Sequence, residues 1–258
     1  MIQFSQLPID ETQSLVRRFT SGKMKYNTYF MNDLTDMACF HTEDSLLLSK
    51  NYGNYNRLYF ISNNKNELIS FLLELSESYA INIPTKRELD SDVLDVLGKS
   101  GYSLLSSYER LYKNTNEGRG DFEDAFAEES DVDTIEILLI EQLFHPVSDR
   151  IPSRQEIAQM VANKQALVNR DDSGVVNGVL LFSIENKKCN FLEWASKASV
   201  GESLFLYLNA FNMMAEKGIE RSTIWVRSDN VRPKKIYLSW GYQPDGLRDY
   251  TFLKNIDK

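Results

Sequence analysis

The two halves of the chain end in the same sequence pattern, and this repeat limits the possible folds more than any other feature. The segment Leu97-Gly-Lys-Ser-Gly101-Tyr102 aligns with Tyr237-Leu-Ser-Trp-Gly241-Tyr242 at an offset of 140 residues. Further on, Lys113-Asn114 aligns with Lys254-Asn255 at an offset of 141, and one extra residue is normal for a turn. A repeat this long indicates two copies of one domain rather than a solenoid of short units.

The C-terminal half has a readable order of secondary structure. Hydrophobic spacing and turn residues predict helix, helix, three strands, helix, strand, helix and strand, at residues 132–143, 152–162, 165–169, 175–184, 189–195, 202–217, 223–227, 233–240 and 249–253. The three consecutive strands are expected to form an antiparallel meander. In the helix over 202–217, we expect Leu204, Leu208, Phe211 and Ala215 to form the buried face, and Gly218 to end the helix.

In the N-terminal half a clear secondary-structure pattern begins only at residue 46, but it ends with the same helix and strand as the C-terminal half. From residue 46 the pattern predicts strand, strand, helix, strand, helix and strand, at residues 46–49, 57–61, 67–77, 79–83, 92–99 and 108–112. The two orders together predict a mixed α/β chain of two tandem domains. Each domain is expected to hold a mostly antiparallel sheet flanked by helices.

The acidity of the chain is concentrated between the two copies. Of the net charge of −8, residues 115–130 carry −5, against −2 for residues 1–114 and −1 for residues 131–258. We therefore predict domains over 1–114 and 131–258 joined by an acidic linker over 115–130, with a long surface loop inside one domain as the alternative. No basic face suited to nucleic acid is visible in this distribution.

Composition excludes several other classes. The longest apolar stretches are far shorter than the roughly 18–20 residues of a membrane-spanning helix, and the N-terminal sequence has no signal for secretion. The two cysteines, Cys39 and Cys189, form no CxxC pair, and the two histidines, His41 and His145, have no metal-ligand spacing. We therefore expect a cytoplasmic protein without disulfide bonds and without a metal.

Three elements within residues 131–255 resemble the GCN5-related N-acetyltransferase superfamily. They are a strand that runs into a loop and a glycine-started helix, Trp194-Ala-Ser-Lys-Ala-Ser-Val-Gly201-Glu-Ser203-Leu204; a strand that ends in asparagine, Ile224-Trp-Val-Arg-Ser-Asp-Asn230; and a helix end, Ile236-Tyr237-Leu-Ser-Trp-Gly241-Tyr242. The last element is the most specific. The resemblance implies that the N-terminal domain is a degenerate copy, because it lacks the glycine loop and has Leu97 where the C-terminal copy has Tyr237.

The resemblance also implies acetyl-CoA or another acyl-CoA as co-substrate, bound where the strand and the helix start separate. Amides at the helix start would hold the pyrophosphate, because that end of a helix exposes unpaired N–H groups and partial positive charge. The sequence departs from the family at Ala198, where an Arg or Gln is usual. The residues implied to contact the cofactor are Leu192, Trp194, Ala195, Val200, Gly201, Glu202, Ser203, Asn230 and Lys234.

Several of these residues also have a possible structural role that needs no ligand. Ser199 and Glu202 have the spacing of a capping box, which stabilises a helix start by itself and places a carboxylate where a pyrophosphate would lie. Asn230 also suits the cap of the next helix, and the cations Arg232, Lys234 and Lys235 also suit a solvated helix face.

Two residues are candidates for proton transfer. The resemblance implies that Tyr237 protonates the departing CoA thiolate; the alternative is an aromatic side chain that packs one face of a short helix. Strand alternation places Glu193 on the apolar face of Cys189, Phe191 and Ala195, where burial would raise its pKa and suit it to deprotonate an ammonium. The alternative for Glu193 is an ion pair with a lysine at the rim of the sheet.

These features predict an acyltransferase that moves an acyl group from acyl-CoA to a primary amine by direct attack, with backbone N–H groups at Leu192–Ala195 polarising the carbonyl. A catalytically silent binding module and an enzyme that takes its acyl group from an acyl carrier protein are the alternatives. The acceptor, a small molecule or a peptide, and the oligomeric state are not readable from the sequence, because specificity lies in loops.

Overall fold

The backbone divides into two compact units. The structure, a computed structural model, describes residues 2–22, 24–30, 34–52, 55–75, 79–115, 120–142, 145, 147–149 and 151–254. Unit 1 takes its residues from 1–108 and 246–258, and unit 2 comprises 109–245. Two long strands, β7 (Tyr102–Asn114) and β12 (Gln243–Lys254), begin in one unit and end in the other. The boundary between the units therefore crosses β7 and β12 and does not fall at a single point in the sequence.

The acidic segment belongs to unit 2 as far as it is described. The Glu123 backbone N–H donates to Oδ1 of Asn209 at 2.9 Å, and Nδ2 of Asn209 donates to the Glu123 carbonyl at 2.7 Å. Phe126 forms an antiparallel bridge with Leu167. Residues 116–119 of the predicted linker lie outside the described residues. Residues 120–127 are thus attached to unit 2 by specific hydrogen bonds.

Unit 1 is built on one mixed sheet. Its strands β1 (Ser5–Gln6), β3 (Met37–His41), β4 (Ser45–Asn51), β5 (Asn56–Ser62), β6 (Tyr79–Thr85) and β12 follow one another in the order β1-β3-β4-β5-β6-β12, and β2 (Tyr26–Asn27) pairs with β5. Neighbours along this order are antiparallel except for β5 and β6, which are parallel.

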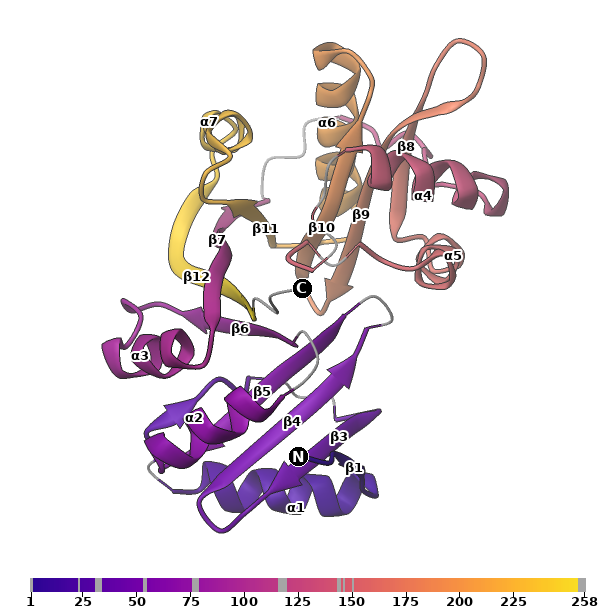
Figure 1. The fold of residues 1–258 in the computed structure, drawn as a ribbon. Helices are drawn as coiled ribbons and strands as arrows, with labels where there is room; N and C mark the ends of the chain where they lie inside the picture. The colour runs from indigo at the N-terminus through magenta and orange to yellow at the C-terminus, as the bar shows by residue number, and fades with distance from the viewer. Residues whose placement is uncertain are drawn as a thin grey trace. The chain divides into compact units, whose positions relative to one another are not determined.

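Side chains alternate along these strands and so fill two cores. Leu58 and Phe60 of β5 pack with α2 (Lys65–Glu74) and α3 (Ser91–Lys99), while Tyr59 and Ile61 pack with α1 (Ile9–Thr20) on the other face. Figure 1 shows these helices around the unit 1 strands. The sequence patterns predicted α2 and α3 but missed α1 and the strands before residue 45.

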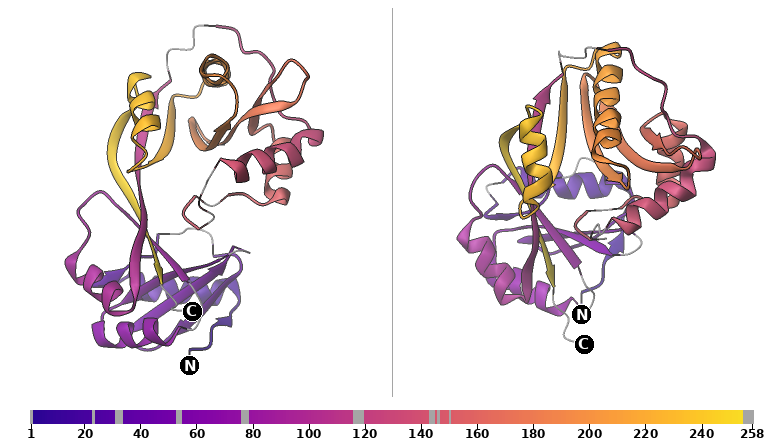
Figure 2. Two further views of the ribbon diagram at one scale, coloured as in Figure 1. Left: turned by 45° about the horizontal axis from the view of Figure 1, so that its top comes forward. Right: turned by 90° about the horizontal axis from the view of Figure 1, so that it is seen from above.

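Unit 2 has the same plan. Its strands β8 (Ala166–Arg170), β9 (Val176–Glu185), β10 (Lys188–Ser196) and β11 (Arg221–Arg227) lie in the order β7-β11-β10-β9-β8. Helices α6 (Val200–Glu216) and α7 (Val231–Ser239) cover one face, and α4 (Val132–Glu141) and α5 (Arg154–Ala162) cover the other (Figure 2). The predicted meander, and the parallel return of β11 beside β10, are both present.

The predicted buried face of α6 is wrong in part. Leu208 is half-exposed and Ala215 is exposed, whereas Leu206, Ala210 and Met213 are fully buried against the sheet. Both stripes are apolar at helical spacing, so hydrophobicity alone did not distinguish the one that faces the sheet. Of the predicted set, Phe211 lies in the core and Leu204 is partly buried against it.

The ends of α3 and α7 have the same hydrogen bonds at the offset of the sequence repeat. Ser100 N–H donates to the carbonyls of Val96 and Leu97, and Trp240 N–H donates to those of Ile236 and Tyr237, 140 positions later. Each helix is followed by a glycine with positive φ, +80° at Gly101 and +87° at Gly241. Residues with a side chain rarely adopt this backbone conformation. The repeat found in the sequence is therefore a repeat of backbone geometry.

Candidate active site

Two parallel strands separate at the centre of unit 2. Strands β10 and β11 pair from Lys188–Arg221 to Phe191–Ile224, and the pairing stops there although β10 continues to Ser196 and β11 to Arg227. Parallel strands normally continue their ladder as long as both extend. The carboxyl-terminal ends of β10 and β11 therefore leave backbone groups available between them, at the positions predicted to contact an acyl-CoA.

A β-bulge at Leu192 determines which side chains face which helices. In the pairing with β9, Phe191 lies opposite Phe182, but Glu193 lies opposite Leu181, so the register shifts by one residue. Trp194 therefore joins Phe191 in the core beneath α6, whereas Ala195 joins the core beneath α4 and α5. The half-exposed Leu192 is the extra residue.

The predicted placement of Glu193 beside Cys189 and Phe191 is therefore wrong. Strict alternation put these three residues on one face, but the bulge turns Glu193 to the face of Leu181, toward α4 and α5. A single inserted residue reverses the side of every residue after it. The sequence alone gave no sign of this bulge.

Glu193 has the raised pKa that a buried carboxylate is expected to have. Burial, with a smaller contribution from the carboxylate of Asp149, raises its pKa to about 9. Asp149 lies in the connection between α4 and α5, where one of its oxygens accepts the backbone N–H of His145. Asp149 is a candidate site residue that no sequence pattern indicated.

Tyr237 lies within electrostatic range of Glu193. Burial raises the pKa of the Tyr237 phenol, and the negative charge of an ionised Glu193 raises it further. The Tyr237 ring lies 6.0 Å from that of Trp194 and 6.0 Å from that of Tyr242, measured between centroids. A phenol with a raised pKa stays protonated at neutral pH and remains able to donate its proton.

Stacked aromatic rings support this arrangement. The rings of Trp194 and Tyr207 are 5.9 Å apart and tilted by 9°, and those of Tyr207 and Trp240 are 4.0 Å apart and tilted by 28°. Rings in contact contribute about 0.5–1.5 kcal/mol per pair beyond their burial. Trp194, predicted to touch the cofactor through its backbone, thus uses its side chain to connect β10 with α6 and α7.

The start of α6 is a complete capping box. Ser199 N–H donates to the Glu202 carboxylate at 2.7 Å, and Glu202 N–H donates to the Ser199 hydroxyl at 3.3 Å. Ser203 forms a hydroxyl–hydroxyl hydrogen bond of 2.9 Å with Ser196, and Asn169 donates to the Glu202 carbonyl at 2.6 Å. The capping box, predicted as the structural alternative to a pyrophosphate site, is therefore confirmed.

Two amides remain at this helix start. Among the described residues, the backbone N–H groups of Val200 and Gly201 have no acceptor. A Cβ atom at Gly201 would meet nothing nearer than the Ser199 hydroxyl at 3.9 Å, so packing does not require a glycine there. Both observations fit an anion that approaches the backbone at Gly201. The Glu202 carboxylate, whose pKa is lowered by Ser199, opposes such an anion.

The predicted cofactor residues on α7 are in different situations. Asn230 stands at the N-cap position of α7, but its side chain makes no capping hydrogen bond, so the structural role considered for it is absent. Lys234 forms an ion pair with Glu109 of β7. Its ammonium group is therefore already neutralised within unit 2, while the exposed Arg232 and Lys235 have no ion-pair partner among the described residues.

The described part of the chain contains no group of three or more His, Cys, Asp or Glu side chains placed to hold a metal ion. None of its helices combines the length and the apolar character that crossing a bilayer requires.

Comparison with known proteins gives structural matches only. No protein-family model matches the sequence, and no curated protein does. A GCN5-related N-acetyltransferase from Sphaerobacter thermophilus is 15% identical, with a TM-score of 0.59 over 84% of this chain and 83% of that one. A GNAT-family acetyltransferase from Colwellia psychrerythraea is 12% identical, with a TM-score of 0.55 over 99% and 100%.

A further match covers both chains completely. A tandem GNAT protein from the clavulanic acid biosynthesis pathway is 9% identical, with a TM-score of 0.57 over 100% of each chain. Identities this low show the fold and nothing finer. The predicted fold class is confirmed: the chain has the mixed α/β fold of a tandem GCN5-related N-acetyltransferase.

Proposed function

We propose that unit 2 transfers an acyl group, with acetyl as the first candidate, from acyl-CoA to a primary amine. The observation that carries this proposal is the early end of the β10–β11 ladder, with Glu193 in β10 close enough to Tyr237 in α7 for its charge to raise the pKa of the phenol. A strong proton acceptor and a protonated phenol are the two groups that aminolysis of a thioester requires. Bound acyl-CoA supplies the activated acyl carbon.

Glu193 is proposed as the general base. With a pKa of about 9, the ionised form of Glu193 has a proton affinity near that of an alkyl amine, so it takes a proton from an incoming ammonium at little cost, and the fraction of Glu193 in this form increases as pH rises toward 9. The negative charge of Asp149 adds to the attraction for a cationic acceptor. The free amine then attacks the carbonyl carbon directly, and no covalent intermediate with the protein is needed.

Tyr237 is proposed as the general acid. It donates its phenolic proton to the sulfur when the tetrahedral intermediate collapses, so the leaving group departs as a thiol. Backbone N–H groups at Leu192–Ala195, beyond the end of the β10–β11 ladder, are the proposed donors to the carbonyl oxygen. The free amides of Val200 and Gly201 are the proposed contacts for the pyrophosphate.

One feature favours a second candidate, a silent module that keeps the fold without turnover. The Glu202 carboxylate already satisfies part of the helix start and is negative where a phosphate would lie. An acyl carrier protein as donor would also tolerate this carboxylate, because the carrier contributes its own docking surface.

The test is release of CoA thiol from acetyl-CoA over a panel of amines that includes amino sugars, amino acids, polyamines and peptides. The wild-type protein should release thiol with at least one amine, and Tyr237→Phe should reduce turnover by about 10²- to 10⁴-fold with little change in CoA affinity. Equal turnover in the two proteins would remove Tyr237 from the mechanism. CoA binding without turnover on any amine would favour the silent module.

A further inference from the structure

The face of the unit 2 sheet that bears Glu193 is covered by helices over only part of its width. Residues of β8, β9 and β10 form the core beneath α4 and α5, and among the described residues none from β7 or β11 joins that core. Figure 1 shows α4 and α5 on the side of β8 and β9, away from β7 and β11. The β7–β11 part of this face therefore has no helical cover within unit 2.

Trp225 of β11 lies on this uncovered part of the face. Its neighbours Ile224 and Val226 belong to the core beneath α6, so strand alternation turns Trp225 to the opposite face. The bulge turns Glu193 to that face as well. The last pair of the β10–β11 ladder is Phe191 with Ile224, so Trp225 is the first residue of β11 after the ladder ends. Glu193 and Trp225 therefore flank the open ends of the two strands on the same side of the sheet.

The Trp225 side chain is accessible to a ligand. The residue is 39% exposed, whereas the other two tryptophans, Trp194 and Trp240, pack against the aromatic core beneath α6. A single exposed apolar residue is ordinary elsewhere on a protein surface. Beside the proposed base it has a second meaning, because small-molecule sites combine aromatic walls with a few polar groups. Trp225 and Glu193 supply one of each.

The charges around Trp225 limit what can lie on its ring. The guanidinium of Arg110 in β7 lies over the indole, with 5.8 Å from its central carbon to the ring centroid, and forms an ion pair of 2.6 Å with Asp245. Because a cation already lies at this ring, a second positive group there would be repelled, whereas a neutral flat group would not. The ammonium group of an acceptor is attracted instead to the carboxyl groups of Glu193 and Asp149.

We propose that the acceptor is a primary amine that carries an aromatic ring, and that Trp225 selects it by stacking on that ring while the amine reaches Glu193. The inference rests on the acyl transfer proposed for unit 2 and names its substrate class. Offset aromatic rings attract each other beyond the effect of burial. A polyamine would bring a second cation to Arg110, and a small aliphatic amine would leave the indole uncovered. Trp225 is thus a specificity-determining residue.

The experiment compares phenethylamine, propylamine and cadaverine as acceptors in the thiol-release assay with acetyl-CoA. In the wild-type chain, kcat/KM for phenethylamine should be at least about tenfold above that for either of the others. Trp225→Val keeps a residue that favours strands. It should raise KM for phenethylamine about tenfold, with little change in kcat and none in the reaction of propylamine. Trp225→Phe keeps a ring and should retain most of the preference.

Val175→Ala, at an exposed apolar residue in the turn before β9, is the control and should behave as wild type. If Trp225→Val does not fold, Trp225→Phe and the three wild-type rates decide the matter. Equal kcat/KM for phenethylamine and propylamine, a preference for cadaverine, or an unchanged KM in Trp225→Val would each overturn the proposal.

Binding of phenethylamine in the presence of CoA, followed by ligand-observed NMR, separates this proposal from the one on which it rests. If no amine is acetylated, the proposed acyl transfer fails, but about tenfold weaker binding to Trp225→Val than to wild type would still place an aromatic amine at Trp225. Equal binding to both proteins, or no binding to a folded wild-type chain, would overturn the proposal whatever the turnover.

Discussion

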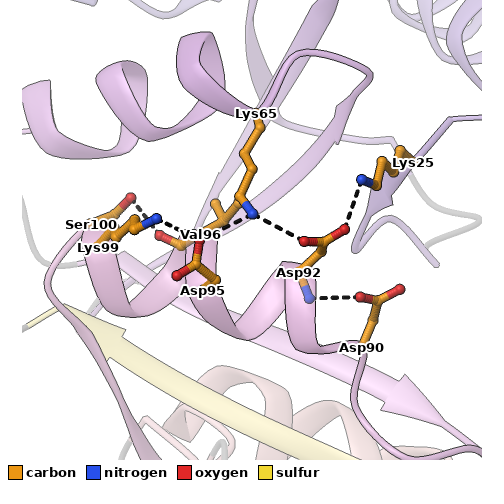
Figure 3. A network of polar contacts seen from close by, with 8 residues as sticks. All are labelled: Lys25, Lys65, Asp90, Asp92, Asp95, Val96, Lys99 and Ser100. Atoms are coloured by element: carbon orange, nitrogen blue, oxygen red, sulfur yellow. Dashed lines mark hydrogen bonds and ion pairs between the residues drawn. The ribbon is translucent and has the colours of Figure 1, made fainter.

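The two units share a fold, but their equivalent pairs of helices, α2 with α3 and α6 with α7, have opposite charges. In unit 1, Lys65 in the first turn of α2 bridges to Asp92 and Asp95 of α3, each at 3.0 Å, and Lys25 bridges to Asp92 at 2.7 Å (Figure 3). At the offset of 140, Asp92 and Asp95 correspond to Arg232 and Lys235 of α7. Counted from the helix caps, Lys65 corresponds to Val200.

This reversal of charge is what the proposed function requires, with an anion bound in unit 2 and none in unit 1. Unit 1 links its two helices with ion pairs and places acidic residues on α3. Unit 2 has free amides at the start of α6, cations on α7 and no acidic residue in the first turn of α7. Three residues before the end of the equivalent strands stand Tyr59 in β5 and Glu193 in β10. Unit 1 thus lacks the proposed base, the proposed acid and an open phosphate site.

The largest effect is expected from Glu193→Gln. Turnover at neutral pH should fall by about 10²- to 10⁴-fold, and the rate should lose its increase with pH up to about 9. Glu185→Gln, at an exposed carboxylate of β9, is the matched control and should behave as wild type. A Glu193→Gln protein with a normal pH–rate profile would exclude Glu193 as the base.

The same substitution should change the dependence of stability on pH. The pKa of Glu193 in the folded chain, about 9, is above its ordinary value of 4.5, so the folded state binds the extra proton between these values. The stabilisation is complete below about pH 4.5 and is lost as pH rises toward 9. Chemical unfolding at pH 5, 7 and 9 should therefore show a smaller decrease for Glu193→Gln than for wild type. An equal decrease would mean that Glu193 is not buried as described.

A smaller effect is expected from two matched glycine substitutions. Gly201 in α6 and Gly98 in α3 both have room for a methyl group and neither has positive φ. Gly201→Ala and Gly98→Ala should each stabilise the chain by about 0.5–1 kcal/mol, because alanine favours a helix. Only Gly201→Ala should weaken acetyl-CoA binding, by about tenfold, because its methyl group stands where the pyrophosphate approaches. Equal affinity in both variants would place the phosphates elsewhere.

The smallest effect is expected from opening the ion-pair network of unit 1. Asp92 has its pKa lowered to about 2 by hydrogen bonds from Lys25 and Lys65, so its contribution to stability is present above about pH 4 and is lost as pH falls toward 2. Asp92→Asn should reduce the melting temperature slightly at pH 7 and not at all at pH 2. Exposed ion pairs contribute little, so acetyl-CoA binding by unit 2 should not change. A large loss of affinity would show that the two units are not separate in function.

The sequence predicted the repeat and most of the elements because both rest on local signals. Gly241 and Tyr242 recur at a fixed offset, and the capping box of Ser199 and Glu202 is readable from its spacing alone. Helix α1 was not predicted, although its buried residues Thr12, Val16 and Phe19 have helical spacing.

The site was less predictable because it depends on register and on contacts between distant residues. The bulge at Leu192 reversed the face of Glu193, and Asp149 comes from a connection without a motif. The ion pair between Lys234 and Glu109 joins residues 125 positions apart, so spacing could not reveal that this lysine is occupied. Residues that act through tertiary contacts need the fold before their roles can be assigned.

The most direct test is the stoichiometry of acetyl-CoA binding, measured by titration calorimetry on the full chain. The difference between the units predicts one molecule per chain, with binding lost or weakened in Gly201→Ala and unchanged in Asp92→Asn. Two molecules per chain would contradict a closed site in unit 1, and no binding at all would contradict an open one in unit 2.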